Sequence, residues 1–329
     1  MRTSLTEMLG LDHPIVQAPI GGLSNPKLAA AVSNAGGLGT IAMTWTEPEV
    51  MRARIRETRS LTDRPFGVNL ILEWPQEERV EVALEEGVRV LSFFWGDPAP
   101  HLDRIHEAGA IVMLTVGTAA EAERAVDAGV DVIVAQGWEA GGHVWGNVAT
   151  LPLVASVTAA VPSRPVIAAG GIADGRGLAA VLALGAAGAW LGTRFAASVE
   201  AGAHPDYLDR LIAARESDTV YGVPFDIGWP DAPHRVLRNA TVAAWEAAGR
   251  PRAGTRPGEG DVVARDADGE SIQRYSSAAP RADVVGDMDA YSLWAGQSAG
   301  LIHDVRPAAE IVRTIAADAD AILRRLVGL

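Results

Sequence analysis

Cysteine is absent from this 329-residue chain, and lysine occurs once, at Lys27. Without cysteine, the chain can form no disulfide, no thiolate metal ligand and no cysteine nucleophile. The 41 acidic residues outnumber the 28 basic ones and leave a formal net charge of -13, with no basic tract to interrupt the negative field. Nucleic acid and anionic membranes are therefore not expected as partners.

Long apolar segments are also missing. The first 14 residues, MRTSLTEMLGLDHP, lack the apolar core of a secretory signal peptide. The longest weakly polar stretch, residues 177–193, is interrupted by glycines and divides into a helix and a strand, so we expect no transmembrane span. The sequence therefore predicts a cytoplasmic protein that does not bind membranes.

The sequence does contain eight short apolar runs, and each run after the first follows a segment that has the pattern of a helix and a turn. The runs begin at Ile15, Gly37, Phe66, Val88, Ala110, Asp131, Pro165 and Gly188. Continuous apolarity is typical of strands buried on both faces of a parallel sheet, and each parallel pair needs a crossover. Eight such units predict an α/β fold, the TIM (β/α)8 barrel, with its active site at the carboxyl ends of the strands.

Helical spacing is clearest over residues 98–109 and 119–129, where Gly109 and Gly129 stand at the positions of helix C-caps. A final helix is expected over about 307–326, with apolar positions at 311, 315, 322 and 326. We expect this last helix to return to the barrel and complete its outer ring.

The length fits one barrel with an addition, because such barrels commonly occupy about 250 residues. We expect residues 1–221 to form the barrel, with residues 197–221 helical. Residues 222–305 are rich in loop-forming segments and too long to be structureless, which predicts a lid or small subdomain over the active site. Residues 306–329 would then supply the closing helix.

Two glycine corners follow the seventh and eighth runs. Ala169, Gly170 and Gly171 end one strand, and Gly192 and Thr193 end the next. These are the two loops where barrels most often hold a phosphate, and glycine lets the backbone approach an anion closely. Taken alone, each corner is also explained by a tight turn.

The segment QGWEAGGH, residues 136–143, follows an apolar run and brings bare backbone and the imidazole of His143 to one place. Histidine titrates near pH 6.5, so it can accept a proton from carbon or hold an anionic substrate near neutral pH. By the residues alone, His143 is equally a structural residue of the barrel rim. We assign no catalytic role to the other six histidines, and their spacing predicts no metal site.

Several segments closely resemble the nitronate monooxygenase family, formerly called 2-nitropropane dioxygenases. They are QAPIGG from Gln17, AVSNAGGLGTIA from Ala31, GVNLIL from Gly67, QGWEAGGH from Gln136, AAGGIADGRGLAAVLALGA from Ala168, GTRF from Gly192 and WAGQSAGL from Trp294. The resemblance covers about residues 15–198 and resumes at 294–301. Its motifs are specific for barrels that contain FMN and less specific for the reaction.

The resemblance implies a TIM barrel that holds FMN without a covalent link. Gly170, Gly171, Gly192 and Thr193 would hold the phosphate, with Ala169 beside them. The flavin ring and ribityl chain would lie against Gln17, Ala18, Pro19, Asn69, Gln136, Gly141, Gly142 and Gln297. Simpler roles stay open for three of these side chains: Asn69 as a core amide, Gln136 as a tie at the rim, and Gln17 as a link to a neighbouring strand.

The implied reaction is oxidation of an alkyl nitronate, such as propionate 3-nitronate, or of a nitroalkane, by FMN and dioxygen to a carbonyl compound and nitrite. His143 would be the base or the partner of the substrate anion, and Trp138 and Trp145 are candidates for the pocket wall. A homodimer is one assembly that the sequence leaves open.

Two other functions remain at this point. The first keeps FMN but draws electrons from NAD(P)H, as in the similar enoyl-acyl carrier protein reductases and quinone reductases. The second is a barrel that acts as a regulatory or interaction module, with or without flavin.

Overall fold

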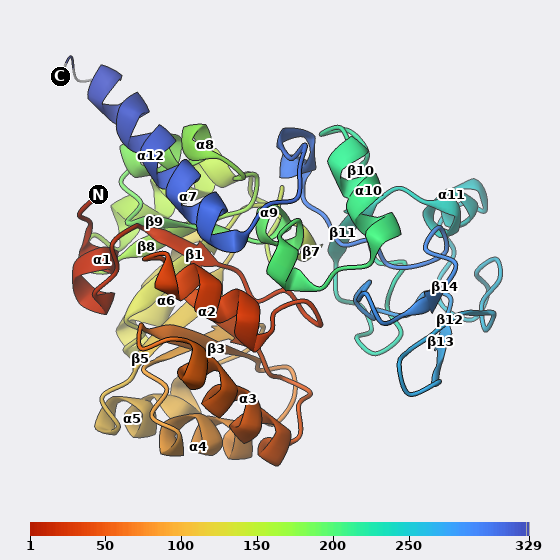
Figure 1. Ribbon diagram of the computed structural model, residues 1–329, viewed down its shortest axis with the longest axis horizontal. Coiled ribbons are helices and arrows are strands. Elements are labelled where there is room, and N and C mark those ends of the chain that lie inside the picture. Colours follow the sequence, from red (N-terminus) through yellow and green to blue (C-terminus); the bar gives the residue numbers. More distant parts are fainter. Residues whose placement is uncertain (327, 329) are drawn as a thin grey trace.

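Eight parallel strands form the centre of the molecule, and the predicted TIM barrel is confirmed (Figure 1). The computed structural model describes residues 1–326 and 328. The sheet order is β1-β9-β8-β6-β5-β4-β3-β2, and a parallel bridge from Val16 to Leu38 brings the first strand back to the second. The strands are β1 (Ile15–Gln17), β2 (Gly39–Ala42), β3 (Phe66–Ile71), β4 (Val90–Phe94), β5 (Ile111–Val116), β6 (Val132–Gln136), β8 (Val166–Ala169) and β9 (Gly188–Leu191). Each lies within one of the eight apolar runs.

The strands are apolar on both faces because the sheet has two buried sides. In β6, Val132 and Val134 belong to the packed interior of the barrel, whereas Ile133 and Ala135 pack outward against the helices. Side chains alternate across a strand, so each face needs its own apolar set. This requirement accounts for the unbroken apolar runs in the sequence.

Helices surround the sheet. They are α2 (Pro26–Asn34), α3 (Pro48–Leu61), α4 (Glu77–Glu85), α5 (Ala99–Glu107), α6 (Ala119–Ala128), α7 (Thr150–Ala160) and α8 (Gly175–Ala183), with α1 (Ser4–Leu9) beneath the barrel. Gly109 and Gly129 have φ values of 71° and 107°. Because that left-handed conformation favours glycine, the predicted helix ends are confirmed.

The last helix, α12 (Ala308–Leu326), packs between α8 and α2. A Cβ on Gly175 of α8 would lie 2.4 Å from the Cβ of Asp318, so the two helices meet closely at a residue without a side chain. Ile311 and Ile315 are buried in this contact, but Leu326 is 71% exposed. The apolar position at 326 therefore does not face the barrel, since the helix extends beyond it at that point (Figure 1).

Residues 219–296, here called the insert, lie at one end of the barrel (Figure 1). They follow α9 (Thr193–Ala196), η1 (Val199–Ala201) and α10 (Pro205–Ala213), and they precede η2 (Gln297–Leu301). The insert contains β10 (Thr219–Gly222), β11 (His234–Leu237), α11 (Ala240–Ala247), β12 (Val262–Arg265), β13 (Ser271–Gln273) and β14 (Val285–Gly286). Its strands are too short to leave a periodic signal in the sequence.

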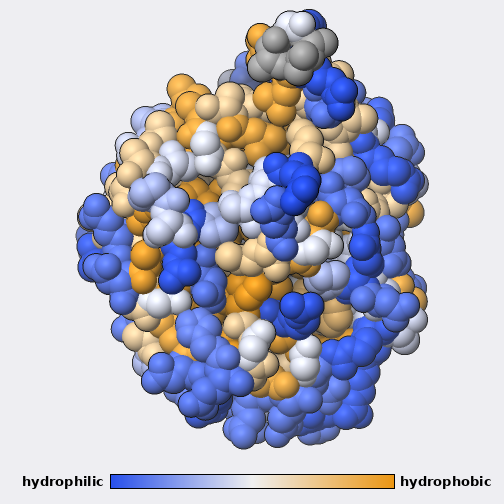
Figure 2. Space-filling view, turned by 90° about the vertical axis from the view of Figure 1, so that its left-hand side faces the viewer, coloured by the Kyte–Doolittle hydropathy of each residue, from blue (hydrophilic) through white to orange (hydrophobic). Residues whose placement is uncertain are grey.

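Two three-stranded sheets organise the insert, with orders β10-β11-β7 and β13-β12-β14. β7 (Gly142–His143) belongs to the barrel loop that follows β6, so the first sheet joins the insert to the barrel. The helix expected over 197–221 is wrong at its end, because residues 219–222 pair with β11 as a strand. Figure 2 shows the opposite end of the molecule, where hydrophilic residues surround a more apolar centre. None of the described helices is long and apolar enough to cross a membrane.

Candidate active site

A cavity of about 590 Å³ opens at the carboxyl ends of the barrel strands. Its wall combines residues in the last part of the eight barrel strands, or in the loops that follow them, with side chains of the insert. Of the residues expected around a cofactor, the wall contains Ala18, Pro19, Asn69, Gln136, Gly141, Gly142, His143, Ala169, Gly170, Gly171, Gly192 and Thr193. The volume lies within the range of roughly 300–1,000 Å³ that small-molecule sites occupy.

The glycine corners present backbone donors to this cavity. Gly170 and Gly171 have φ values of 97° and 73°, and both line the wall together with Gly192. Within residues 1–326 and 328, the amides of these three glycines make no backbone hydrogen bond. A Cβ on Gly192 would meet nothing closer than the Cβ of Ala18 at 3.6 Å, so the backbone there is open. Free amides in an open corner are suited to an anion such as a phosphate.

Gln136 holds the loop that presents His143. Its Nε2 donates to the carbonyl of His143 at 3.1 Å, and its Oε1 accepts from the amide of Trp145 at 2.9 Å. Both ends of the amide are therefore used inside the loop, although the side chain still lines the cavity. The tie at the barrel rim is the role that this geometry supports.

Gly141 lies against residues 295–296 at the end of the insert. A Cβ on Gly141 would come within 2.2 Å of the amide nitrogen of Gly296, and one on Gly296 would come within 2.8 Å of the nitrogen of Gly141. The amide of Gly296 also donates to Oγ1 of Thr193 at 3.0 Å. Two backbones without side chains thus pass each other beside the cavity, which joins the β6 loop to the WAGQ segment.

His143 lies on β7, between two indole rings. The imidazole is 4.0 Å from the ring centroid of Trp229 at 33° and 5.4 Å from that of Trp294 at 35°. Its Nε2 is buried and has no hydrogen-bond partner within residues 1–326 and 328. Burial, with a smaller contribution from His234, lowers the pKa of His143 to about 3. The ring is therefore neutral at physiological pH, and the imidazole lines the cavity with its Nε2 side closed off by protein.

His234, for which we predicted no catalytic role, is the cross-strand neighbour of His143 in the pairing of β7 with β11. Its Nδ1 must donate to the carbonyl of Ala232 at 2.9 Å, and its Nε2 accepts from the amide of Phe225 at 3.1 Å. Burial lowers the pKa of His234 to about 4. The ring is thus a fully bonded neutral support beside His143, and the sequence offered no spacing that would pair the two.

Of three other residues expected at the cofactor, Asn69 lines the cavity, whereas Gln17 and Gln297 do not. Asn69 lines the cavity, and its Nδ2 donates to Oγ of Ser92 at 2.8 Å, which leaves its oxygen for the cavity. Gln17 is fully buried outside the cavity wall, where its Nε2 donates to the carbonyl of Ala18 and its Oε1 accepts from Thr40 at 2.9 Å. The Gln17 side chain therefore links β1 to the neighbouring strand β2, the simpler role left open by the sequence.

Gln297 also lies outside the described cavity wall, whereas the adjacent Ser298 is part of it. The backbone amide of Gln297 donates to the carbonyl of Glu139 at 3.0 Å. This contact ties the start of η2 to the β6 loop.

The aromatic wall was misassigned from the sequence. Trp138 faces Arg235, whose guanidinium carbon lies 4.3 Å from the ring centroid, and Trp145 packs on Trp95 at 4.8 Å. Neither lines the cavity. The aromatic side chains that do are Trp45, Phe94, Trp190, Trp229, Tyr291 and Trp294. Trp138 and Trp145 were predicted for the wall because they flank His143 in the sequence. The prediction is wrong because the loops that form the wall are far apart along the chain.

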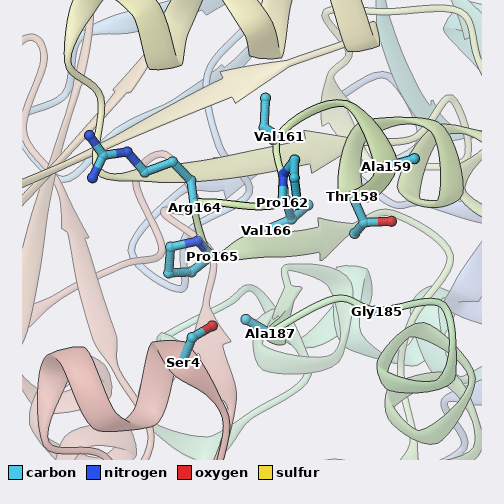
Figure 3. A pocket seen from close by; sticks show the side chains of 10 residues that line it. All are labelled: Ser4, Thr158, Ala159, Val161, Pro162, Arg164, Pro165, Val166, Gly185 and Ala187. Atoms are coloured by element: carbon cyan, nitrogen blue, oxygen red, sulfur yellow. The ribbon is translucent and has the colours of Figure 1, made fainter.

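A second hollow, of about 410 Å³, lies at the other end of the barrel (Figure 3). It is bordered by Ser4 of α1 and by the turn 161–166 that precedes β8. Arg164 extends away from the other labelled side chains (Figure 3). This hollow lies away from the carboxyl ends of the strands, and no orphaned buried polar atom of the described residues borders it. The catalytic candidate is therefore the cavity at His143.

The barrel, with its cavity at the carboxyl ends of the strands, places the protein in the class of (β/α)8 enzymes. The described residues contain no group of histidines and carboxylates able to hold a metal ion. The family model for nitronate monooxygenase matches residues 2–78 and 73–318, so the chain belongs to the nitronate monooxygenase family and is an oxidoreductase. Members of this family are flavoproteins, which supports a flavin as the cofactor.

Individual relatives agree with this placement. Nitronate monooxygenase from Pseudomonas aeruginosa is 35% identical, over 96% of this chain and 98% of its own length. A Mycobacterium tuberculosis protein, (3aS,4S,5R,7aS)-5-hydroxy-7a-methyl-1-oxo-octahydro-1H-indene-4-carboxyl-CoA dehydrogenase, is 40% identical over 77% of this chain and 70% of its own. Among solved structures, FabK from Thermotoga maritima matches with a TM-score of 0.83 and 35% identity, covering 100% of this chain and 99% of its own. Nitroalkane oxidase from Streptomyces ansochromogenes matches at 0.81 and 31%, covering 98% and 99%.

Proposed function

We propose that the protein uses FMN and dioxygen to oxidise alkyl nitronates to carbonyl compounds and nitrite. The observation that carries this proposal is the neutral imidazole of His143 on the wall of the cavity. Two nitronates and one dioxygen give two carbonyl compounds and two nitrite ions, so atoms and electrons balance without a further reductant.

The residues present fit FMN. The free amides of Gly170, Gly171 and Gly192, with Thr193, would hold the phosphate, and Ala169 would lie beside it. Ala18, Pro19, Asn69, Gly141 and Gly142 would border the ring and the ribityl chain. When bound, the flavin supplies the electron transfer between nitronate and dioxygen. In this proposal residues 1–221 carry the cofactor, and residues 222–305 cover the site as a lid or subdomain.

His143 binds and orients the substrate anion in this proposal. A neutral imidazole can donate its N–H to a nitronate oxygen, and an anion at that position favours the charged ring and so raises its pKa. With an unliganded pKa of about 3, however, the ring is a weak base for removing a proton from carbon. The low pKa of the imidazole therefore favours the ionised nitronate over the neutral nitroalkane as substrate.

A second candidate is an FMN reductase that takes electrons from NAD(P)H, of the enoyl-acyl carrier protein reductase or quinone reductase type. It is favoured by the 40% identical Mycobacterium tuberculosis relative, which is a dehydrogenase of a carboxyl-CoA compound. A dehydrogenase and a reductase run the same hydride exchange in opposite directions. The two candidates differ in which small molecule reduces the flavin.

An anaerobic titration separates them. The purified protein is mixed without oxygen with ethyl nitronate, and separately with NADH and NADPH, while the flavin absorbance is followed. We expect the nitronate to change the flavin spectrum and the nicotinamides to leave it unchanged. Reduction by NADH or NADPH alone would establish the second candidate. A colourless protein that cannot be reconstituted with FMN would contradict both and leave a flavin-free module.

A further inference from the structure

Trp229 of the insert is the centre of an aromatic cluster at the mouth of the cavity. The tryptophan cluster consists of Trp45, Trp74, Trp95, Trp145 and Trp229. The ring centroid of Trp229 lies 6.1 Å from Trp45, 5.2 Å from Trp74 and 5.0 Å from Trp95, all edge to face. The same ring stacks on His143. Rings at these distances attract one another beyond simple burial.

The cluster is assembled from separate loops. Trp45 follows β2, Trp74 follows β3 and Trp95 follows β4. Each residue therefore lies in a loop on the active-site side of the barrel. Trp45 and Trp229 line the cavity, and Trp45 is 56% exposed whereas Trp229 is 3% exposed. Trp45 therefore offers an exposed ring at the entrance, and the buried Trp229 supports both that ring and the imidazole.

Trp95 occupies an unfavourable backbone conformation to reach its place. Its φ is 59°, a left-handed value that is uncommon for a bulky residue and costs on the order of 1–3 kcal/mol. That turn sets its ring 4.8 Å from Trp145 and 5.2 Å from Phe94, which itself lines the cavity. The strained turn thus packs Trp95 behind the aromatic wall, against Phe94.

Charge is sparse in the same wall. Of the described residues that line the cavity, Asp266 and Arg281 carry charged side chains. The guanidinium of Arg281 is held by Asp283, with Nε to Oδ1 at 2.8 Å and the second hydrogen bond at 3.2 Å. A carboxylate carried into this cavity would therefore lose water without gaining an uncommitted cation.

We propose that the physiological substrate is a nitronate with an apolar, ring-bearing body that packs on Trp45, the exposed member of the tryptophan cluster, while its nitronate group meets His143. This inference rests on the proposed function and specifies its substrate class. It disfavours short nitronates that carry a second negative charge, such as propionate 3-nitronate.

Unreactive mimics test binding separately from turnover. Phenylacetate replaces the nitronate group of phenylmethanenitronate by a carboxylate, and succinate does the same for propionate 3-nitronate. Isothermal titration of the flavin-loaded protein should show phenylacetate binding at least about tenfold more tightly than succinate, because one ring is buried in place of a charge. Equal or tighter binding of succinate would overturn the proposal.

Variants locate the effect. Trp45→Ala removes an exposed ring at the entrance. It should weaken phenylacetate by about threefold to tenfold and change succinate little. Trp245→Phe is the matched control, since Trp245 lies on α11 outside the cavity wall and bonds the carbonyl of Pro251. Equal losses for both mimics in Trp45→Ala would contradict the role of the cluster.

Turnover then separates this inference from the proposed function. Oxidation of phenylmethanenitronate with a higher kcat/KM than propionate 3-nitronate supports both. Preference for propionate 3-nitronate keeps the proposed function and overturns the substrate class. Tight phenylacetate binding without oxidation of any nitronate keeps a ring-binding site and overturns the reaction.

Discussion

The properties of His143 depend on neighbours that the local sequence does not contain. The Gly-Gly-His pattern predicted that an imidazole would reach the site, and the structure places it on the cavity wall. Its low pKa and free Nε2 arise from Trp229, Trp294 and His234, which come from distant parts of the chain. Residue type was thus predictable, whereas the state of the residue was not.

Replacing the ring without removing its bulk tests this residue. His143→Phe keeps an aromatic ring between Trp229 and Trp294 but removes both nitrogens. If His143 donates to the nitronate, kcat/KM for ethyl nitronate should fall by roughly 10–100-fold, the value of a hydrogen bond to a charged group. Flavin content and Tm should match the unsubstituted protein.

The parent nitroalkane serves as the comparison substrate. Turnover of neutral nitroethane should already be low in the unsubstituted protein, because the imidazole is a weak base. A loss of roughly 10²–10⁴-fold in the variant, confined to nitroethane, would instead assign general-base catalysis to His143. Unchanged kinetics with both substrates would remove the residue from the reaction.

At the scale of elements, the long-range pattern of the barrel was predictable and the short strands of the insert were not. Eight apolar runs each contain a strand because both faces of the sheet are buried. The strand β7 has two residues and β14 has two, which is too short for any periodicity. Pairing of β7 with β11 depends on the fold already being assembled. Gln17 and Gln297 were expected at the cavity from the family resemblance, and both lie outside its wall.

The contact between the β6 loop and residues 295–296 can be tested with one methyl group. Gly141→Ala would place a Cβ 2.2 Å from the amide nitrogen of Gly296, where neither backbone can yield without moving β7 or η2. We expect Tm to fall by several degrees, corresponding to roughly 1–3 kcal/mol of overpacking, together with weaker flavin retention.

Gly21→Ala is the control for that substitution. Gly21 also lines the cavity, yet a Cβ there meets no atom within 4 Å, and its φ is not left-handed. Its Tm should stay within about a degree of the unsubstituted protein. A Gly141→Ala protein as stable as Gly21→Ala would show that the loop and residues 295–296 separate easily.

For the whole molecule, two buried neutral histidines make stability depend on pH. Burial lowers the pKa of His143 to about 3 and of His234 to about 4, both below the value of 6.5 for an unfolded chain. The unfolded state therefore binds protons first as the pH falls. Each histidine's contribution to the free energy of unfolding is fully present above pH 6.5. It is lost progressively as the pH falls toward the pKa of that histidine in the folded state.

The free energy of unfolding, measured in urea from pH 8 to pH 5, tests this dependence. Between pH 6.5 and pH 5 it should fall by up to ~1.4 kcal/mol per pH unit for each of the two histidines. In His143→Phe the dependence of the free energy of unfolding on pH should be weaker by the contribution of one histidine. A slope that is the same in both proteins would show that His143 titrates normally in the folded state.

The position of Trp229 in the chain sets the order in which the molecule is completed. All eight barrel strands precede residue 192, whereas the indole that packs on His143 arrives with the insert. A growing polypeptide can thus assemble its cylinder while the entrance is still wide. In the finished molecule, moving Trp229 away from the entrance would separate its ring from three other indoles, those of Trp45, Trp74 and Trp95.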